Sequence, residues 1–354
     1  MASPATTRTV RPLDGLRAEA AGPPGGRGGP CGPGAGLVAE HLRLLGAATD
    51  DTETSGFVVE GAGFAPLVTR TAWSDAGADL TDEATVQAAT GIMAVHGRRD
   101  GGPRGIAADY AATATGVLTV QGVLAGLLAQ ARGGQVAQVS TSASRAGLLA
   151  VSQYLAAAGA DEGEAAELAP GGPPFTSADG TVFELETLDP GAWAAFWRVL
   201  GAPEKAVRAG WRPFQFRYAT ACAPVPAALH IAVRQTEWER IRYAAGVSGA
   251  QVCPLRSLAD RGIPDAPPWN LVPYEATYPS GATAGSPQLA GGPLAGLTVL
   301  EAGRRIQAPL AAHLLGLLGA EIVRIEPPGG DPLRGMPPAC SGISARWLAL
   351  NRGK

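Results

Sequence analysis

A sequence pattern near the beginning of the 354-residue chain recurs close to its end. RPLDGLR at 11–17 is followed by AGLVAEHLRLLGA at 35–47, and GPLAGLT at 292–298 is followed by APLAAHLLGLLGA at 308–320. The first copy carries a Gly/Pro-rich insertion at 22–36. Helices rich in alanine, leucine and glycine resemble one another by composition, so similarity without common structure is the alternative. A true repeat means that the chain starts the same fold twice.

The second copy has the pattern of a β-α-β unit. LTVL at 297–300 predicts a strand, residues 308–319 predict an apolar helix, and EIVRIE at 321–326 predicts another strand. Such a unit implies two parallel strands joined by a right-handed crossover. The Gly/Pro loop that follows, PPGGDPLRG, is of a kind that favours phosphate binding.

Periodicity divides the middle of the chain into two blocks. Residues 84–158 combine an apolar stretch, a helix from about Thr113 to Arg132, a strand at 135–141 and a further Ala/Leu-rich helix, which indicates α/β structure. Residues 171–275 begin with a Gly/Pro loop and a strand, and two helices follow. Thr236 is the predicted N-cap of the second of these helices, and Gly246 is its predicted C′ residue.

These blocks predict an α/β protein with a Rossmann-like large domain built on a parallel sheet, plus a smaller α+β domain. The opening β-α-β unit of a second copy follows. We place a shortened large-domain region at 1–165, the small domain at 166–278 and a Gly/Pro-rich linker at 279–292. Residues 293–354 then start a second, truncated large domain.

Composition and motifs exclude several classes of function. The net charge is -3 and the pI is about 5.9, so we expect no nucleic-acid binding. The most apolar window, GVLTVQGVLAGLLA, is short and interrupted by Gln121, so no membrane segment is expected. The four cysteines and four histidines are too scattered for a metal site, and reduced thiols in a cytoplasm are expected. Walker A, G-x-S-x-G and G-x-G-x-x-G motifs do not occur.

The blocks resemble family III CoA-transferases, the CaiB/BaiF type that includes formyl-CoA transferase and α-methylacyl-CoA racemase. The stretch from PLAGLTVLEAGRRIQAP to GGDPLRG, followed by LALNRGK, looks like the amino-terminal signature of that family. Residues 86–140 look like its central block. GTVFELETLDPGAWAAFWRVLGAPEKA and TEWERIRYAAGVSGAQVCPLRSLAD look like its small domain. The resemblance covers most of residues 80–354.

The sequence also departs from the family pattern. The first copy passes from Ala47 to Thr85 in under forty residues, where family members have a long helical and Rossmann-like segment, so part of the CoA pocket is missing. The second copy has its opening motifs only. Either the chain is a fragment of a longer tandem protein, or another chain completes its pocket. The expected partners are acyl-CoA and carboxylic acid substrates, and either a second copy of the chain or a complementary CoA-transferase chain.

The resemblance implies that Asp109, in GIAADYAATATG, is the nucleophile. Its carboxylate would attack an acyl-CoA thioester to form a mixed anhydride, and the freed CoA thiolate would then form an aspartyl-CoA thioester. CoA is a substrate in this reaction, and no permanently bound cofactor or metal is expected. From the residues alone, the alternative is that Asp109 caps the following helix.

Further site residues follow from the same resemblance. Backbone N–H groups of Ile306, Gln307 and Ala308 are implied to meet CoA, with Arg334 as a phosphate partner or, alternatively, a solvated loop arginine. The loop 170–175, PGGPPF, either covers the acyl-aspartate or is an ordinary turn. A two-base racemase is disfavoured because ADLTDEATVQ lacks a histidine. A catalytic CoA-transferase and a non-catalytic scaffold half of a tandem or heteromeric transferase both remain open.

Overall fold

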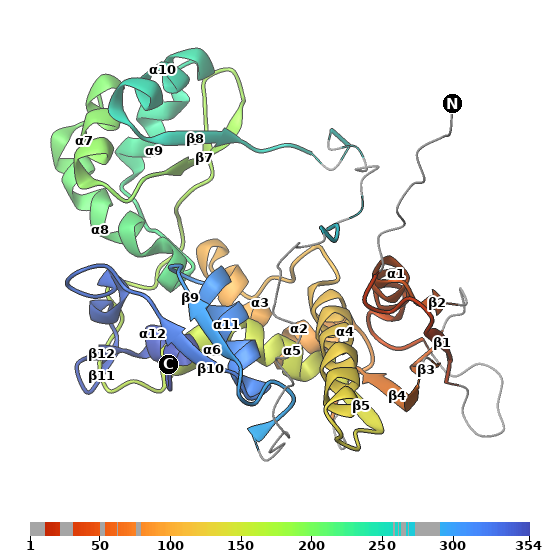
Figure 1. The fold of residues 1–354 in the computed structure, drawn as a ribbon. Helices are drawn as coiled ribbons and strands as arrows, with labels where there is room; N and C mark the ends of the chain where they lie inside the picture. Colours follow the sequence, from red (N-terminus) through yellow and green to blue (C-terminus); the bar gives the residue numbers. More distant parts are fainter. Residues whose placement is uncertain are drawn as a thin grey trace, which may run out of the picture.

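The structure is a computed structural model in which a small domain stands apart from a larger body (Figure 1). It describes residues 11–21, 31–49, 54–61, 63–75, 79–257, 259–260, 262, 267, 269–272 and 291–354. Most of the predicted linker at 279–292 and of the Gly/Pro insertion at 22–36 therefore lies outside the described residues.

A mixed five-stranded sheet forms the base of the larger body. Its strands are β1 (Arg17–Ala20), β2 (Ala48–Thr49), β3 (Phe57–Gly61), β4 (Phe64–Ala72) and β5 (Gln138–Ser142), in the order β2-β1-β3-β4-β5. The pairs β1–β2 and β4–β5 are parallel, whereas β3 pairs antiparallel with both β1 and β4. The α/β class is thus confirmed, but the sheet is not wholly parallel because the unexpected hairpin β3–β4 lies in its centre.

Seven helical segments belong to the described part of the larger body before residue 160. They are α1 (Ala35–Leu45), α2 (Glu83–Ala89), α3 (Ile92–His96), η1 (Gly97–Asp100), α4 (Tyr110–Ala131), α5 (Ala143–Ala150) and α6 (Ser152–Ala158). Among them, α1, α4 and α5 pack against the sheet. α4 packs against α1, α5, β4 and β5. A Cβ on Gly122 would lie 2.5 Å from Val139 Cγ1, so glycine is required for this close approach of helix and strand.

The apolar character of α4 follows from its central position. The helix has 22 residues, and an 18-residue window within it has a mean hydropathy of 1.6, so by length and composition alone it could span a membrane. However, 56% of that window is buried inside the fold. Burial against the sheet explains the composition as that of a core helix.

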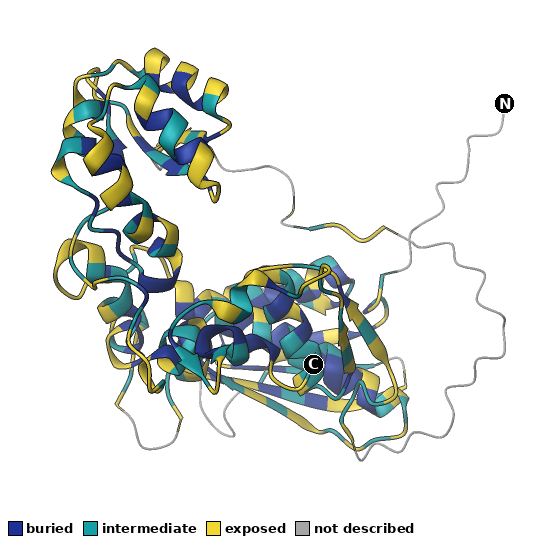
Figure 2. Cartoon of the chain, turned by 90° about the vertical axis from the view of Figure 1, so that its left-hand side faces the viewer, coloured by how far each residue is buried: buried dark blue, intermediate teal, exposed yellow. Residues whose placement is uncertain are grey.

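In its described residues, the small domain packs four helices against a three-stranded antiparallel sheet. The strands are β6 (Phe175–Thr176), β7 (Val182–Glu186) and β8 (Gln251–Pro254), and the helices are α7 (Pro190–Val199), α8 (Glu204–Thr220), α9 (Ala227–Arg234) and α10 (Trp238–Ser248). Trp193, Phe196, Trp197 and Phe214 form its aromatic core. Figure 2 shows this buried interior as separate from that of the larger body.

The predicted caps of α10 are wrong. Glu237 is the N-cap, and the helix continues through Gly246 to end before Gly249, whose φ is +78°. The Thr236 hydroxyl instead donates to Ala232 O of the preceding helix at 2.8 Å. Gly249 ends the helix because its left-handed conformation suits glycine.

The terminal block, residues 291–354, contains a two-stranded parallel sheet. Its elements are β9 (Thr298–Glu301), α11 (Gln307–Leu317), β10 (Glu321–Arg324), η3 (Pro332–Gly335), β11 (Ala339–Cys340), β12 (Ile343–Ser344) and α12 (Ala345–Asn351). The parallel pairing of β9 and β10, predicted from the sequence, is confirmed. α12 packs against α6, and Arg346 of α12 is ion-paired with Glu164 at 2.6 Å. The terminal block therefore docks on the central block.

The first unit (residues 11–49) and the second unit (residues 292–326) make the same backbone hydrogen bonds. Leu13 N donates to Leu45 O at 2.9 Å, and Leu294 N donates to Leu318 O at 2.9 Å. In both units, the first residue of the second strand donates a backbone hydrogen bond to the residue that precedes the first strand. These bonds are Ala48 N to Leu16 O and Glu321 N to Leu297 O, both at 2.9 Å. The repeat is therefore structural as well as compositional.

Candidate functional site

Two side chains of α2 organise the start of α4. The buried amide of Gln87 accepts from Ile106 N at 2.7 Å and donates to Ala108 O at 3.2 Å, which fixes the loop before the helix. The Glu83 carboxylate accepts from the first free N–H groups of α4, those of Ala111 at 2.8 Å and Ala112 at 2.9 Å. Glu83 therefore satisfies the donors and the positive end of the helix dipole.

Asp109 lies at the N-cap position of α4, but its side chain does not cap the helix. It is exposed, and it makes no hydrogen bond or ion pair with any residue in the described ranges. The alternative that Asp109 is a helix cap is therefore wrong, because Glu83 fills that role. The Asp109 carboxylate is left free to meet a ligand.

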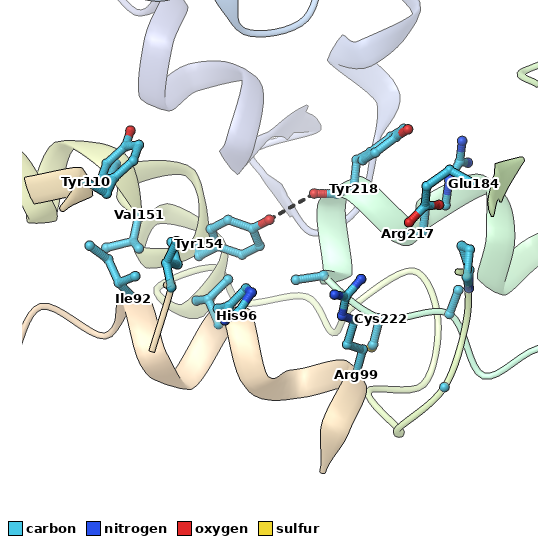
Figure 3. Close-up of a pocket in the computed structure, with 17 residues that line it drawn as sticks. Ile92, His96, Arg99, Tyr110, Val151, Tyr154, Glu184, Arg217, Tyr218 and Cys222 are labelled. Carbon is cyan, nitrogen blue, oxygen red and sulfur yellow. Dashed lines mark hydrogen bonds between the residues drawn. The ribbon is translucent and has the colours of Figure 1, made fainter. Parts of the chain in front are cut away.

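A cavity of about 620 Å³ lies beside this helix start, between the central block and the small domain. Ile106 and Tyr110, on either side of Asp109 in the sequence, both line it, whereas Asp109 itself does not. The cavity has two different ends (Figure 3). Ile92, Val151 and Tyr110 line a mainly apolar end, and charged side chains line the opposite end. The volume is typical of a small-molecule site.

Tyr154 lies in the middle of the cavity, where three parts of the chain meet. Its hydroxyl donates to Tyr218 O of α8 at 3.0 Å (Figure 3). Two guanidinium groups lie over its ring, that of Arg98 at 5.5 Å and that of Arg346 at 5.8 Å. Burial raises the pKa of Tyr154. The residue therefore connects the central block with the small domain and with the terminal block.

Arg99, Glu184 and Arg217 form the charged end of the cavity. Burial raises the pKa of the Glu184 carboxyl, and the positive charges of Arg99 and Arg217 oppose that effect. Arg217 is buried and bound to the Glu186 carboxylate and to Phe214 O. This end therefore combines a buried ion pair with charged groups that face the cavity.

The predicted loop at 170–175 forms one wall of the cavity through Gly171 and Pro173. Gly171 N donates to Arg99 O at 2.9 Å and its carbonyl accepts from Ala223 N at 3.0 Å. Gly172 has φ +119°, and a Cβ there would lie 3.0 Å from the Ala223 carbonyl oxygen, so glycine is required. The loop is a fixed part of the wall, and covering of an acyl-aspartate remains a prediction.

The predicted CoA-binding residues share one edge of the second unit. Ile306, Gln307 and Ala308 follow β9 at the start of α11, and Arg334 follows β10 in η3. Because β9 and β10 are parallel, their carboxyl ends lie at the same edge. Arg305 Nη2 approaches Glu186 to 3.9 Å, so the turn before α11 lies near the charged end of the cavity.

Arg334 is bound within the terminal block. Its guanidinium donates to both Glu326 oxygens, at 2.9 and 3.0 Å, and lies 3.9 Å from the Trp347 ring. The side chain is still 42% exposed, so one face is open to solvent. A role in binding phosphate remains a prediction.

Sequence reasoning missed the residues that shape this site. Glu83 and Gln87 are four positions apart in a mostly apolar stretch. This spacing places two polar side chains on the same face of a helix, so it could have indicated their shared role. Arg99, Tyr154 and Glu184 come from separate segments and share no local pattern. Their proximity depends on the packing of the small domain.

A family model and curated proteins match parts of the chain. The family described as CoA-transferase family III matches residues 72–263 and 294–354. The succinyl-CoA–L-malate CoA-transferase beta subunit of Chloroflexus aurantiacus is 44% identical over 64 residues, which are 18% of this chain and 16% of that protein. The alpha subunit is 40% identical over 65 residues, 18% of this chain and 15% of its own length. The chain thus spans about a sixth of these curated relatives.

Two solved structures are similar to part of the chain. A CaiB/BaiF family protein from Brucella suis is 18% identical with a TM-score of 0.39, and the match covers 51% of this chain and 49% of that one. A hypothetical protein from Mycobacterium tuberculosis is 18% identical with a TM-score of 0.40, covering 54% and 53%.

Proposed function

The chain belongs to CoA-transferase family III, and on that premise we propose that it transfers CoA from an acyl-CoA thioester to a carboxylic acid, with Asp109 as the nucleophile. The observation that carries the proposal is the free Asp109 carboxylate. It stands at the start of α4 beside a cavity, while Glu83 takes over the capping of that helix. A carboxylate with no structural partner is available for covalent chemistry.

The proposed reaction proceeds through two kinds of covalent intermediate on Asp109, a mixed anhydride with each acid and an aspartyl-CoA thioester between them. The carboxylate attacks the thioester carbonyl, the C–S bond breaks, and a mixed anhydride and a CoA thiolate form. The thiolate then attacks the Asp109 carbonyl carbon, which releases the first acid as a carboxylate and leaves an aspartyl-CoA thioester. The carboxylate of the second acid attacks the aspartyl-CoA thioester, which releases CoA thiolate and forms a second mixed anhydride. The thiolate then attacks the acyl carbonyl of that anhydride, which gives the new acyl-CoA and the free Asp109 carboxylate. Bonds of similar energy are exchanged, so the site mainly has to position the partners and exclude water.

The terminal block supplies the proposed contacts to CoA. The first N–H groups of a helix have no intrahelical partner, so those of Gln307 and Ala308 can donate to an acyl or phosphate oxygen of CoA. Ile306 precedes them at the N-cap position, and its side chain is 52% exposed. Arg334 would contact a CoA phosphate with the face that Trp347 and Glu326 leave open.

A non-catalytic scaffold half is the second candidate function. The observation that favours it is that Ile106 and Tyr110 line the cavity while Asp109 does not. In that case a complementary chain would supply the reactive carboxylate. The matching Chloroflexus proteins are named as alpha and beta subunits, which supports pairing with another CoA-transferase chain.

A trapping experiment separates these two functions. We expect incubation with succinyl-CoA to leave a covalent adduct on the peptide that contains Asp109, and hydroxylamine to convert it to a hydroxamate detected by mass spectrometry. The experiment is run on the chain alone and together with a complementary CoA-transferase chain. Asp109→Asn should abolish the adduct, whereas Asp100→Asn, an exposed aspartate paired with Arg104, should not. An adduct that persists in Asp109→Asn, or one found only on the complementary chain, would support the scaffold function.

Stability measurements provide the control for folding. Because Asp109 makes no cap hydrogen bond, Asp109→Asn should leave the free energy of unfolding unchanged. Glu83→Ala should lower it by about 1 kcal/mol, the usual effect of losing a cap. Loss of the adduct in Asp109→Asn can then be assigned to chemistry.

A further inference from the structure

Two adjacent arginines of η1 have opposite surroundings. Arg98 Nη1 donates to Thr220 O at 3.1 Å, and its guanidinium lies over the Tyr154 ring. Arg99 is exposed and lines the cavity, and its side chain makes no hydrogen bond or ion pair with any described residue. Its backbone is fixed by the hydrogen bond from Gly171 N to Arg99 O. Arg98 therefore holds the wall together, and Arg99 presents a free guanidinium.

The other arginine at this end of the cavity is already occupied. Arg217 is bound to Glu186 and Phe214 O, and its guanidinium lies 3.8 Å from the Phe214 ring centroid and 4.3 Å from that of Tyr218. Arg217 is thus engaged by a carboxylate, a backbone carbonyl and two aromatic rings of the protein, although it also lines the cavity. Of the two arginines labelled at this end in Figure 3, Arg99 is the one whose side chain has no hydrogen bond or ion pair with a described residue.

The carboxyl group of Glu184 faces the same cavity as the guanidinium of Arg99. Glu184 is half-buried in β7, and it accepts no hydrogen bond within the described part of the chain. Burial raises the pKa of Glu184, and the positive charge of Arg99 opposes that effect. A ligand carboxylate at Arg99 would gain two charge-assisted hydrogen bonds and would be repelled by Glu184. The two residues therefore have opposite effects on an anionic ligand.

We propose that Arg99 binds the distal carboxylate of a dicarboxylic substrate, so that the cavity selects acyl groups bearing a second carboxylate. This inference rests on the proposed function and specifies its substrate class. The apolar end, with Ile92 and Val151, lies beside the start of α4 and accommodates the carbon chain near Asp109. The charged end is across the cavity, where Arg99 receives the far terminus. Arg99 is a specificity-determining residue in this arrangement, and Glu184 limits how tightly the acid is held.

The test compares succinate with butyrate, which have four carbons each and differ in the second carboxylate. Isothermal titration calorimetry on the full chain measures binding of each acid without requiring turnover. We expect succinate to bind at least about tenfold more tightly than butyrate, the effect of one charge-assisted contact. Arg99→Gln should remove that difference, and Glu184→Gln should increase succinate affinity. Arg104→Gln is the control, since Arg104 is exposed, pairs with Asp100, and does not line the cavity.

Three outcomes overturn the proposal: succinate binding that is no tighter than butyrate binding, including no binding of either acid; an Arg99→Gln variant that keeps the preference; and equal losses in Arg99→Gln and Arg104→Gln. Circular dichroism of each variant checks the fold, which Arg99→Gln should preserve because the side chain has no partner. Failure of acyl transfer leaves this binding difference intact, so the substrate class and the proposed reaction can fail separately.

Discussion

The first unit and the second unit share a backbone but differ in how far their side chains are buried. Leu42 of α1 is fully buried, whereas Leu315, at the equivalent position of α11, is only half-buried. Leu16 is 3% exposed, and its equivalent Leu297 is 48% exposed. Both units close the same hydrogen bonds, so local backbone structure does not require a complete core around it.

The neighbours of the two units explain the difference. In the first unit, β3 pairs with β1, and α4 packs against α1. In the second, the described residues add no third strand to β9 and β10. Leu300, Leu317 and Ile325 are between 55% and 69% exposed, so this unit leaves apolar side chains uncovered. Such exposed side chains favour association, and a second chain as the covering partner stays a prediction.

The second unit has a buried ionic cluster with no counterpart among the described residues of the first unit. Glu301 of β9 binds Arg324 and Lys354, the latter at 2.7 Å. Arg324 also pairs with Asp331. The equivalent of Glu301 in the first unit is Ala20, so this cluster is specific to the terminal block. Buried apolar contacts stabilise the first unit. Buried ion pairs contribute more to the stability of the second unit than to that of the first.

The largest expected effect comes from breaking that cluster. Glu301→Ala gives the second unit the residue of the first, but leaves Arg324 and Lys354 buried with fewer partners. We expect the terminal block to lose about 3–5 kcal/mol of stability. Hydrogen exchange of the β9 and β10 amides measures this, with the exposed Glu321→Ala as control. Equal protection in both variants would mean that the cluster is unimportant.

A matched pair of leucine substitutions tests the contrast in burial. Leu42→Ala should destabilise the first unit by about 2–5 kcal/mol, because it opens a cavity in a closed core. Leu315→Ala should cost about half as much or less, since its side chain is already partly in solvent. Hydrogen exchange of α1 and α11 reports each change. Equal losses would show that the second unit is covered by another part of the chain or by a second chain.

A pair of glycine substitutions should show where the two units are alike. Gly46 and Gly319 end α1 and α11 with φ of 113° and 100°. An alanine at either position meets backbone atoms and adopts a left-handed conformation, so each change should cost about 1–3 kcal/mol. Thermal unfolding of the two variants should give similar shifts. A large difference would contradict the shared backbone geometry.

The smallest expected effect is a pH dependence confined to the second unit. Hydrogen bonding from Arg334 lowers the pKa of Glu326 from 4.5 to about 2. The carboxylate therefore contributes its full stabilisation above about pH 4.5 and loses it as the pH falls toward 2. In Glu326→Gln, amide protection in the terminal block should depend less on pH over this window. An unchanged profile would assign the acid sensitivity to other carboxyl groups.

Local sequence predicted the helix that carries the candidate site but not the surroundings of its side chains. The sequence predicted a long helix from about Thr113, and α4 begins three residues earlier, at Tyr110. The motif around Asp109 could not show that its carboxylate is free, because that depends on Glu83 from a different helix. Arg99 and Glu184 were missed for the same reason, since the cavity exists only where the small domain meets the central block.

The sequence by itself determined the β-α-β pattern of the second unit, the long apolar helix α4 and the aromatic helix α7, because periodicity and hydrogen bonds between near neighbours set these elements. Only the tertiary structure decided that a hairpin enters the centre of the sheet, that α10 ends at Gly249, and that the terminal block docks on α6. These outcomes depend on contacts between segments far apart in the chain. Each such contact is weak alone, and the packing of the whole molecule selects among them.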